Sequence, residues 1–109
     1  MNEELIRYVE REILPRYDAF DRAHRRDHAL TVIAASLRLA RYYEVNPDMV
    51  YAVAAYHDTG LREGRGRHHE ASARIVRGDR NLRRWFTEAE VATIAEAAED
   101  HRASLGRPP

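Results

Sequence analysis

Apolar residues recur every three to four positions along most of this chain, and this spacing limits the folds open to it more than any other feature. Such runs cover residues 3–14, 27–44, 47–58, 68–78 and 88–101. They follow the 3.6-residue period of an amphipathic helix, and no segment shows the apolar-polar alternation of a half-buried strand. Because the connections between most runs are short, neighbouring helices are expected to run antiparallel. The sequence predicts an all-α fold, an antiparallel bundle of about five helices.

Local signals fix several helix ends. Pro15 is expected to end the first helix, because proline disfavours helical geometry in the residue before it. Asn46 and Pro47 form a start signal, with asparagine as the cap and proline at the first helical position. Thr87 and Glu90 have the spacing of a capping box and so predict the start of the last helix.

Two segments between the helices lack a clear period. Residues 59–67 hold three glycines and four charged residues, which predicts an irregular loop. Residues 79–86 are expected to form a single turn that packs against the bundle through Leu82, Trp85 and Phe86.

The composition suits one globular domain that spans residues 1–109. Hydrophobic residues make up 44% of the chain and charged residues 33%, a balance at which chains of this length fold. The 18 acidic and 18 basic residues cancel, so no general attraction to nucleic acid is expected. No apolar run approaches membrane-spanning length and the N-terminus is unlike a signal peptide, which predicts a cytoplasmic protein.

Three of the apolar rows run directly into a histidine. His28 continues the row of Val32, Ala35 and Leu39, His57 that of Val50, Val53 and Ala54, and His101 that of Val91, Ile94 and Ala98. All three are therefore expected to point inward. A single inward histidine is more often a hydrogen-bonded core residue than a ligand.

In an antiparallel bundle these histidines, with Asp58, His68 and His69, would gather at one end. The chain has no cysteine, so a metal held there must use histidine nitrogen and carboxylate oxygen. The sequence thus predicts a metal site at one end of the bundle. His24 is expected in a loop or behind the ligands. The arginines of the glycine-rich loop are either solvated charges or a grip for phosphate, and both readings stay open for Arg62, Arg65 and Arg67.

These residues resemble the HD-domain metal-dependent phosphohydrolases over about residues 23–104. The "YHDTG" segment is similar to the His-Asp motif that names the family, and "RRDHALTVI", "HHEASA" and "EDHRAS" are similar to its other histidine segments. The resemblance implies that the ligands are His28, His57, Asp58, His69 and His101, with His68 in place of His69 if the register of that helix shifts by one.

The family pattern also contains a last aspartate, which would lie beyond Pro109. We therefore expect an HD-type domain that lacks its C-terminal helices; an incomplete site, or a carboxylate from a partner chain, are the alternatives. Asp100 is a further substitute ligand, although its position beside His101 predicts that it faces away.

The chemistry implied is metal-assisted hydrolysis of a small phosphorylated compound, such as a nucleotide. One or two divalent ions of Mn, Fe, Ni, Co, Zn or Mg would activate a water and polarise a phosphoryl oxygen. His28, His57 and Asp58 would hold the first ion, Asp58 would bridge to a second, and His69 and His101 would hold that second ion.

Two other functions compete with hydrolysis. The missing aspartate favours a catalytically inactive HD-like module that binds a nucleotide or a partner subunit. DNA binding by a helix-turn-helix is the weaker alternative, because the arginines are scattered and the net charge is zero. Trp85, Phe86 and the tyrosines leave room for an exposed apolar contact, so a homodimer is a further hypothesis.

Overall fold

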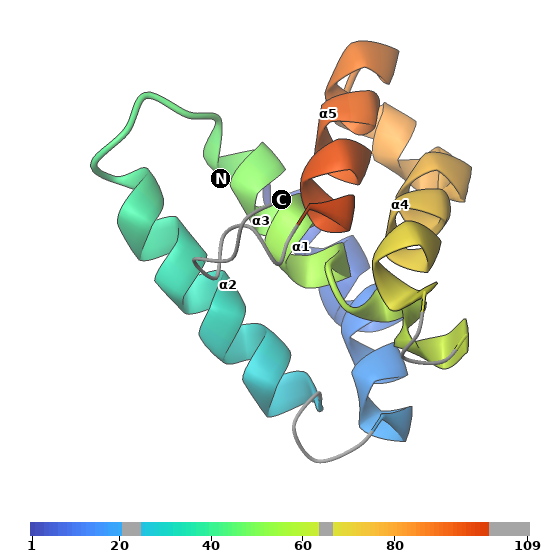
Figure 1. Cartoon of the computed structure of the whole chain (residues 1–109). Coiled ribbons are helices and arrows are strands. Elements are labelled where there is room, and N and C mark those ends of the chain that lie inside the picture. The colour runs from blue at the N-terminus through green and yellow to red at the C-terminus, as the bar shows by residue number, and fades with distance from the viewer. Residues whose placement is uncertain (21–24, 64–66, 101–109) are drawn as a thin grey trace. The chain divides into compact units, whose positions relative to one another are not determined.

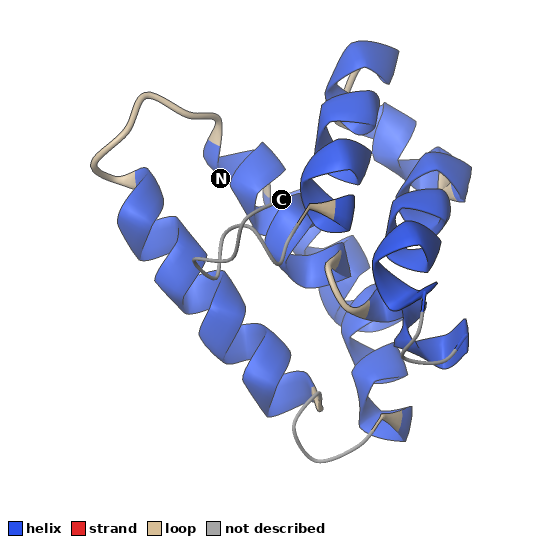
Figure 2. Cartoon of the chain, viewed as in Figure 1, coloured by secondary structure: helices blue, strands red, loops and turns tan. Residues whose placement is uncertain are grey.

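Every regular element is helical in the part of the chain that the structure, a computed structural model, describes (Figure 2). It describes residues 1–20, 25–63 and 67–100, without the side chains of residues 62 and 63. The all-α prediction is confirmed. The chain divides into two compact units, residues 1–55 and 56–109, and each is described by itself.

The first unit opens with a helical segment that changes its hydrogen-bonding pattern twice. Helix α1 (Glu3–Tyr8) starts at Asn2, whose side chain accepts the backbone N–H groups of residues 4 and 5. It continues as the π-helical η1 (Val9–Ile13) and the 3₁₀ segment η2 (Leu14–Ala19) (Figure 1).

Pro15 does not end this segment, so the predicted stop at residue 14 is wrong. The N–H of Leu14 bonds to the carbonyl of Val9, five residues back. A 3₁₀ helix then begins with Pro15 in its first turn, where the missing N–H of proline has no intrahelical acceptor to lose.

Two long-range hydrogen bonds tie this segment to helix α3 (Pro47–Tyr56). The buried hydroxyl of Tyr17 donates to the carbonyl of Ala55 at 2.7 Å, and the N–H of Asn2 donates to the carboxylate of Asp48 at 2.9 Å. The predicted cap of α3 is also present, because the Asn46 side chain accepts the N–H of Asp48. Around these bonds lies the apolar core of the unit, which includes Leu5, Val9, Ile13, Leu14, Ala29, Ile33 and Tyr51. Burial, with the nearby charge of Glu10, raises the pKa of Tyr51 to about 12.

Helix α2 (Arg26–Ala40) differs from its prediction in two respects. Its buried row is Ala29 and Ile33, whereas Leu39 of the predicted row is 61% exposed. His28 immediately precedes Ala29, so the row that contains His28 is rotated by about 100° around the helix from the buried row. His28 is therefore partly exposed. The helix also ends at Ala40 and not near Glu44, because the N–H groups of residues 41–43 bond to carbonyls three residues back in a series of turns.

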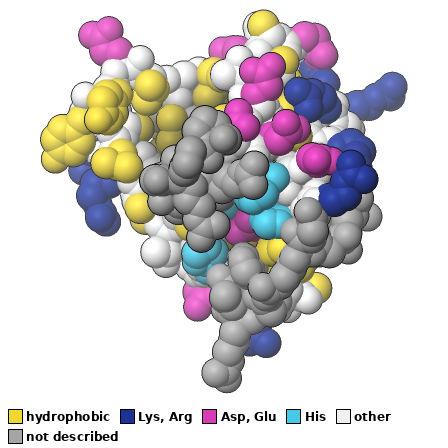
Figure 3. Space-filling view, viewed as in Figure 1, with side chains coloured by type: hydrophobic (Ala, Val, Ile, Leu, Met, Phe, Trp, Pro, Cys, Tyr) yellow, Lys and Arg dark blue, Asp and Glu magenta, His cyan; other side chains and the backbone are white. Residues whose placement is uncertain are grey.

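Exposed apolar side chains explain this early end. Tyr42 and Tyr43 are 80% and 68% exposed, so they gain too little burial to hold a further α-helical turn. Figure 3 shows hydrophobic side chains gathered at the upper left, where Figure 1 places the turn between α2 and α3. The large apolar residues exposed around this helix and turn are Leu30, Leu39, Tyr42, Tyr43 and Val45.

The second unit is built around helix α4 (His68–Gly78), which packs against α5 (Glu88–Glu99) and the 3₁₀ segment η4 (Thr59–Glu63). The predicted bounds of α4 are confirmed, and so is the capping box. Thr87 Oγ1 accepts the N–H of Glu90, and the Glu90 carboxylate accepts the N–H of Thr87. The buried face of α5 carries the predicted Val91, Ile94, Ala95 and Ala98.

One loop prediction for this unit needs correction, and the other agrees with the structure. Residues 59–63 form a 3₁₀ segment and not irregular chain, because Thr59, Gly60 and their neighbours are buried against α4. The turn before α5 contains the 3₁₀ segment η6 (Arg80–Arg84). Phe86 is buried, so it packs inward as the single-turn prediction requires and offers no exposed contact. Across the described residues, no helix combines the length and apolar character needed to cross a bilayer.

Candidate metal centre

The His-Asp pair lies in the tight turn that follows α3. The helix ends at Tyr56, and the hydroxyl of Thr59 donates to the Tyr56 carbonyl at 2.6 Å. This bond satisfies a carbonyl at the helix end, where the regular intrahelical donor is missing. The α-helix therefore ends two residues before the predicted position, and His57 and Asp58 are turn residues. Both side chains are buried.

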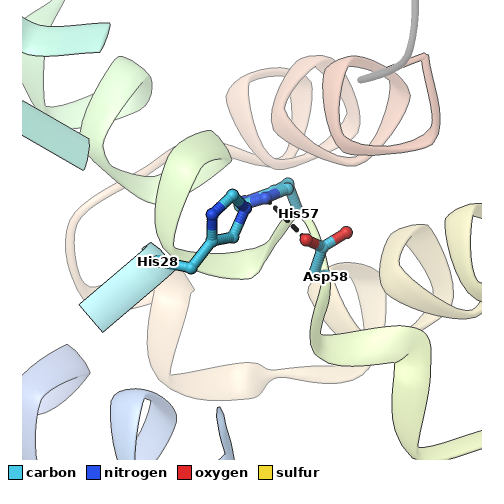
Figure 4. Close-up of side chains that lie close together, drawn as sticks. All are labelled: His28, His57 and Asp58. Atoms are coloured by element: carbon cyan, nitrogen blue, oxygen red, sulfur yellow. Dashed lines mark ion pairs between the residues drawn. The ribbon is translucent and has the colours of Figure 1, made fainter. Parts of the chain in front are cut away.

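The carboxylate of Asp58 turns each of its two oxygens toward a different histidine. Oδ2 lies 2.9 Å from Nε2 of His57 (Figure 4). Oδ1 lies 3.5 Å from Nε2 of His68, the first residue of α4. The turn after α3 and the start of α4 thus bring two imidazole nitrogens and one carboxylate together within the second unit.

Each of these two spacings fits a pair of ligands on one divalent cation. Histidine nitrogen and carboxylate oxygen bind such ions at about 2.1 Å. Two donor atoms that make a right angle at the ion are then about 3.0 Å apart, and two that make a tetrahedral angle are about 3.4 Å apart. The observed distances of 2.9 and 3.5 Å lie close to these values. A protonated His57 would also pair with Asp58 at 2.9 Å, and metal analysis distinguishes the two states.

Burial makes the carboxylate costly without a positive partner. The Asp58 side chain is only 7% exposed, and a buried ionised carboxylate destabilises the fold unless a counter-charge or several hydrogen bonds offset its lost hydration. A divalent cation would supply that charge. Oxygen and nitrogen donors of this kind suit Mn, Fe, Ni, Co and Zn.

The remaining predicted ligands have different placements. His28 lies in the first turn of α2, in the first unit. His69 follows His68 on α4, and the ring centroids of the two histidines are 3.9 Å apart. His24, Arg65 and His101 lie outside the described residues, as does the side chain of Arg62.

Arg67 is the one loop arginine whose side chain is described. It is 78% exposed, and its guanidinium lies 2.7 Å from the carboxylate of Glu70, three residues along. This pair matches the reading of a solvated surface charge. Phosphate binding by Arg62, Arg65 and Arg67 stays a prediction.

Sequence reasoning missed three residues that hold the His-Asp turn in place. Thr59, Gly60 and Ser72 are buried, and each contacts the backbone of the turn or of α4. A serine among the alanines of the buried α4 row was the available signal, because a buried hydroxyl must find hydrogen-bond partners.

Comparison with known proteins agrees with this geometry. The family model described as the HD domain matches residues 25–108, which is most of the chain and includes the His-Asp turn and α4. No curated protein and no solved structure matches the chain. From the match and the candidate metal site, the chain belongs to the HD domain family.

Proposed function

We propose that the protein is a divalent-metal-dependent phosphohydrolase that acts on a small phosphorylated compound, such as a nucleotide. The observation that carries the proposal is the carboxylate of Asp58, buried and turned toward histidines from two separate elements. Membership of the HD domain family supports the same chemistry. A bound divalent ion would supply an activated water and polarise a phosphoryl oxygen.

The predicted ligands and the loop arginines each have a role in this proposal. His28, His57 and Asp58 would hold the first ion, and Asp58 would also contribute to a second. His101 and a histidine of α4 complete that second position. Loop arginines, among them Arg62 and Arg65, would bind the equatorial phosphate oxygens through their planar donor pairs.

For the α4 ligand we favour His68 over His69. The family pattern implies His69, but the distance of 3.5 Å from His68 Nε2 to Asp58 Oδ1 supports its neighbour. The variant His68→Ala is expected to weaken binding of the second ion by roughly tenfold or more, because a direct ligand is lost. His69→Ala is the matched control and should weaken it less. Isothermal titration with Mn²⁺ measures both, and a larger loss in His69→Ala would reverse the assignment.

Metal analysis followed by a hydrolysis assay tests the function itself. The purified chain is incubated separately with Mn²⁺, Co²⁺, Ni²⁺ and Zn²⁺, desalted, and analysed for bound metal by mass spectrometry. The loaded protein is then assayed with p-nitrophenyl phosphate and its diester. We expect at least one ion per chain, and hydrolysis that stops when a chelator removes the ion. Metal without hydrolysis would favour the inactive binding module. A protein that shows neither bound metal nor hydrolysis would refute the metal centre.

A further inference from the structure

The hydroxyl of Ser72 joins the two ends of the turn that carries the His-Asp pair. It donates to the carbonyl of His57 at 2.8 Å and accepts the N–H of Gly60 at 2.9 Å. Ser72 is fully buried. One side chain of α4 therefore holds the backbone on both sides of Asp58.

Gly60 allows the turn to lie directly on the backbone of α4. A Cβ atom at this position would overlap the carbonyl oxygen of His68 and would lie 2.5 Å from the nitrogen of Ser72 and 2.8 Å from Cβ of Ala71. Such contacts are too short for any side chain. The turn and the first two turns of α4 are thus in backbone contact, without a layer of side chains between them.

The position of Ser72 on α4 links this contact to the candidate metal ligands. Residues four apart lie on the same face of a helix, one turn from each other, so Ser72 lies one turn below His68. The bond to the His57 carbonyl fixes the His-Asp turn against the same helix that carries His68. The Ser72 hydroxyl therefore helps to set the spacing between Asp58 and His68.

Packing alone does not require a serine here. Alanine would fill the site and favours the helix more, whereas a buried hydroxyl destabilises the protein unless it finds partners. Ser72 uses its donor and an acceptor position on the two residues that flank the Asp58–Thr59 segment.

We infer that Ser72 is a positioning residue, which holds the carboxylate of Asp58 at the distance from His68 that the proposed second metal position needs. The inference rests on the proposed metal-dependent function. Groups behind metal ligands typically change metal affinity by 10–100-fold when they are removed. Ser72 acts on the backbone of the ligand-bearing turn and touches no substrate in this scheme.

The test compares Ser72→Ala with Tyr56→Phe by isothermal titration with Co²⁺ and by amide hydrogen exchange without metal. Tyr56→Phe is the matched control, because it removes another hydroxyl hydrogen bond of the same unit, to Asp79 at 2.6 Å. We expect about a tenfold or greater loss of Co²⁺ affinity in Ser72→Ala and wild-type affinity in Tyr56→Phe. The Gly60 amide of the metal-free Ser72→Ala variant should exchange about tenfold faster than in the wild type.

The outcomes separate this inference from the proposed function. Equal Co²⁺ affinity in wild type and Ser72→Ala would overturn the inference and leave the metal centre intact. Absence of Co²⁺ binding by the wild type would refute both. The wild-type protein alone also provides a check that needs no variant, because its Gly60 amide must be protected; exchange at the rate of an exposed amide would overturn the inference.

Discussion

Replacing Asp58 with asparagine is expected to abolish stoichiometric metal binding and to lower phosphate-ester hydrolysis by about a thousandfold or more. Asparagine keeps the size of the side chain but loses the negative charge and one of the two oxygens that face His57 and His68. A metal ion contributes several kcal/mol to stabilising a phosphoryl transition state, and about 4 kcal/mol corresponds to about a thousandfold in rate. Metal content and turnover of p-nitrophenyl phosphate measure the two effects.

The same substitution is expected to leave the metal-free protein as stable as the wild type or more stable. Without a cation, the buried carboxylate of Asp58 opposes folding, and a neutral amide lowers that cost. Asp48→Asn is the control, since it makes the same change in charge at a residue that binds the N–H of Asn2; it should keep metal binding. An Asp58→Asn protein that binds Mn²⁺ as tightly as the wild type would contradict the proposed centre.

Gly60→Ala is expected to destabilise the second unit by about 3 kcal/mol or more. Overpacking a close contact typically costs 1–3 kcal/mol and occasionally more, and here the new Cβ would meet the backbone of residues 68 and 72, which cannot rotate away as a side chain can. The change should also separate the His-Asp turn from α4 and so lower metal affinity. Urea denaturation followed by circular dichroism gives the free energy of unfolding.

Gly78→Ala is the matched control for this prediction. Gly78 ends α4, and a Cβ there would meet nothing within 4 Å. Alanine also reduces the conformational freedom of the unfolded chain, so this variant should be as stable as the wild type or up to about 1 kcal/mol more stable. Equal free energies of unfolding for the two alanine variants would show that the turn does not lie against α4 as described.

The helices that could be predicted best are those with strong local signals. The capping box of Thr87 and Glu90 and the cap at Asn46 form through contacts between residues two or three apart, so the sequence alone specifies them. The end of α2 and its buried row depend on what packs against the helix. That information is not local, and the predicted row through Leu39 was wrong for this reason.

The candidate site was predictable in part for the same reasons. The His-Asp pair follows directly from the end of an apolar row, and the two histidines at the start of α4 follow from a helical run. The choice between His68 and His69 could not be made, because consecutive helical residues point about 100° apart and the rotation of α4 depends on the Ser72 and Gly60 contacts. Those contacts join residues 8 to 15 positions apart.

Anomalous diffraction from crystals of the chain soaked in Mn²⁺ would locate an ion bound at the His57–Asp58 pair. We expect a manganese peak within about 2.0–2.2 Å of both Nε2 of His57 and the carboxylate of Asp58, with His68 on the other side of that carboxylate. Crystals in which no ion lies near this pair, so that His57 and Asp58 contact only each other and neighbouring protein groups, would contradict this expectation.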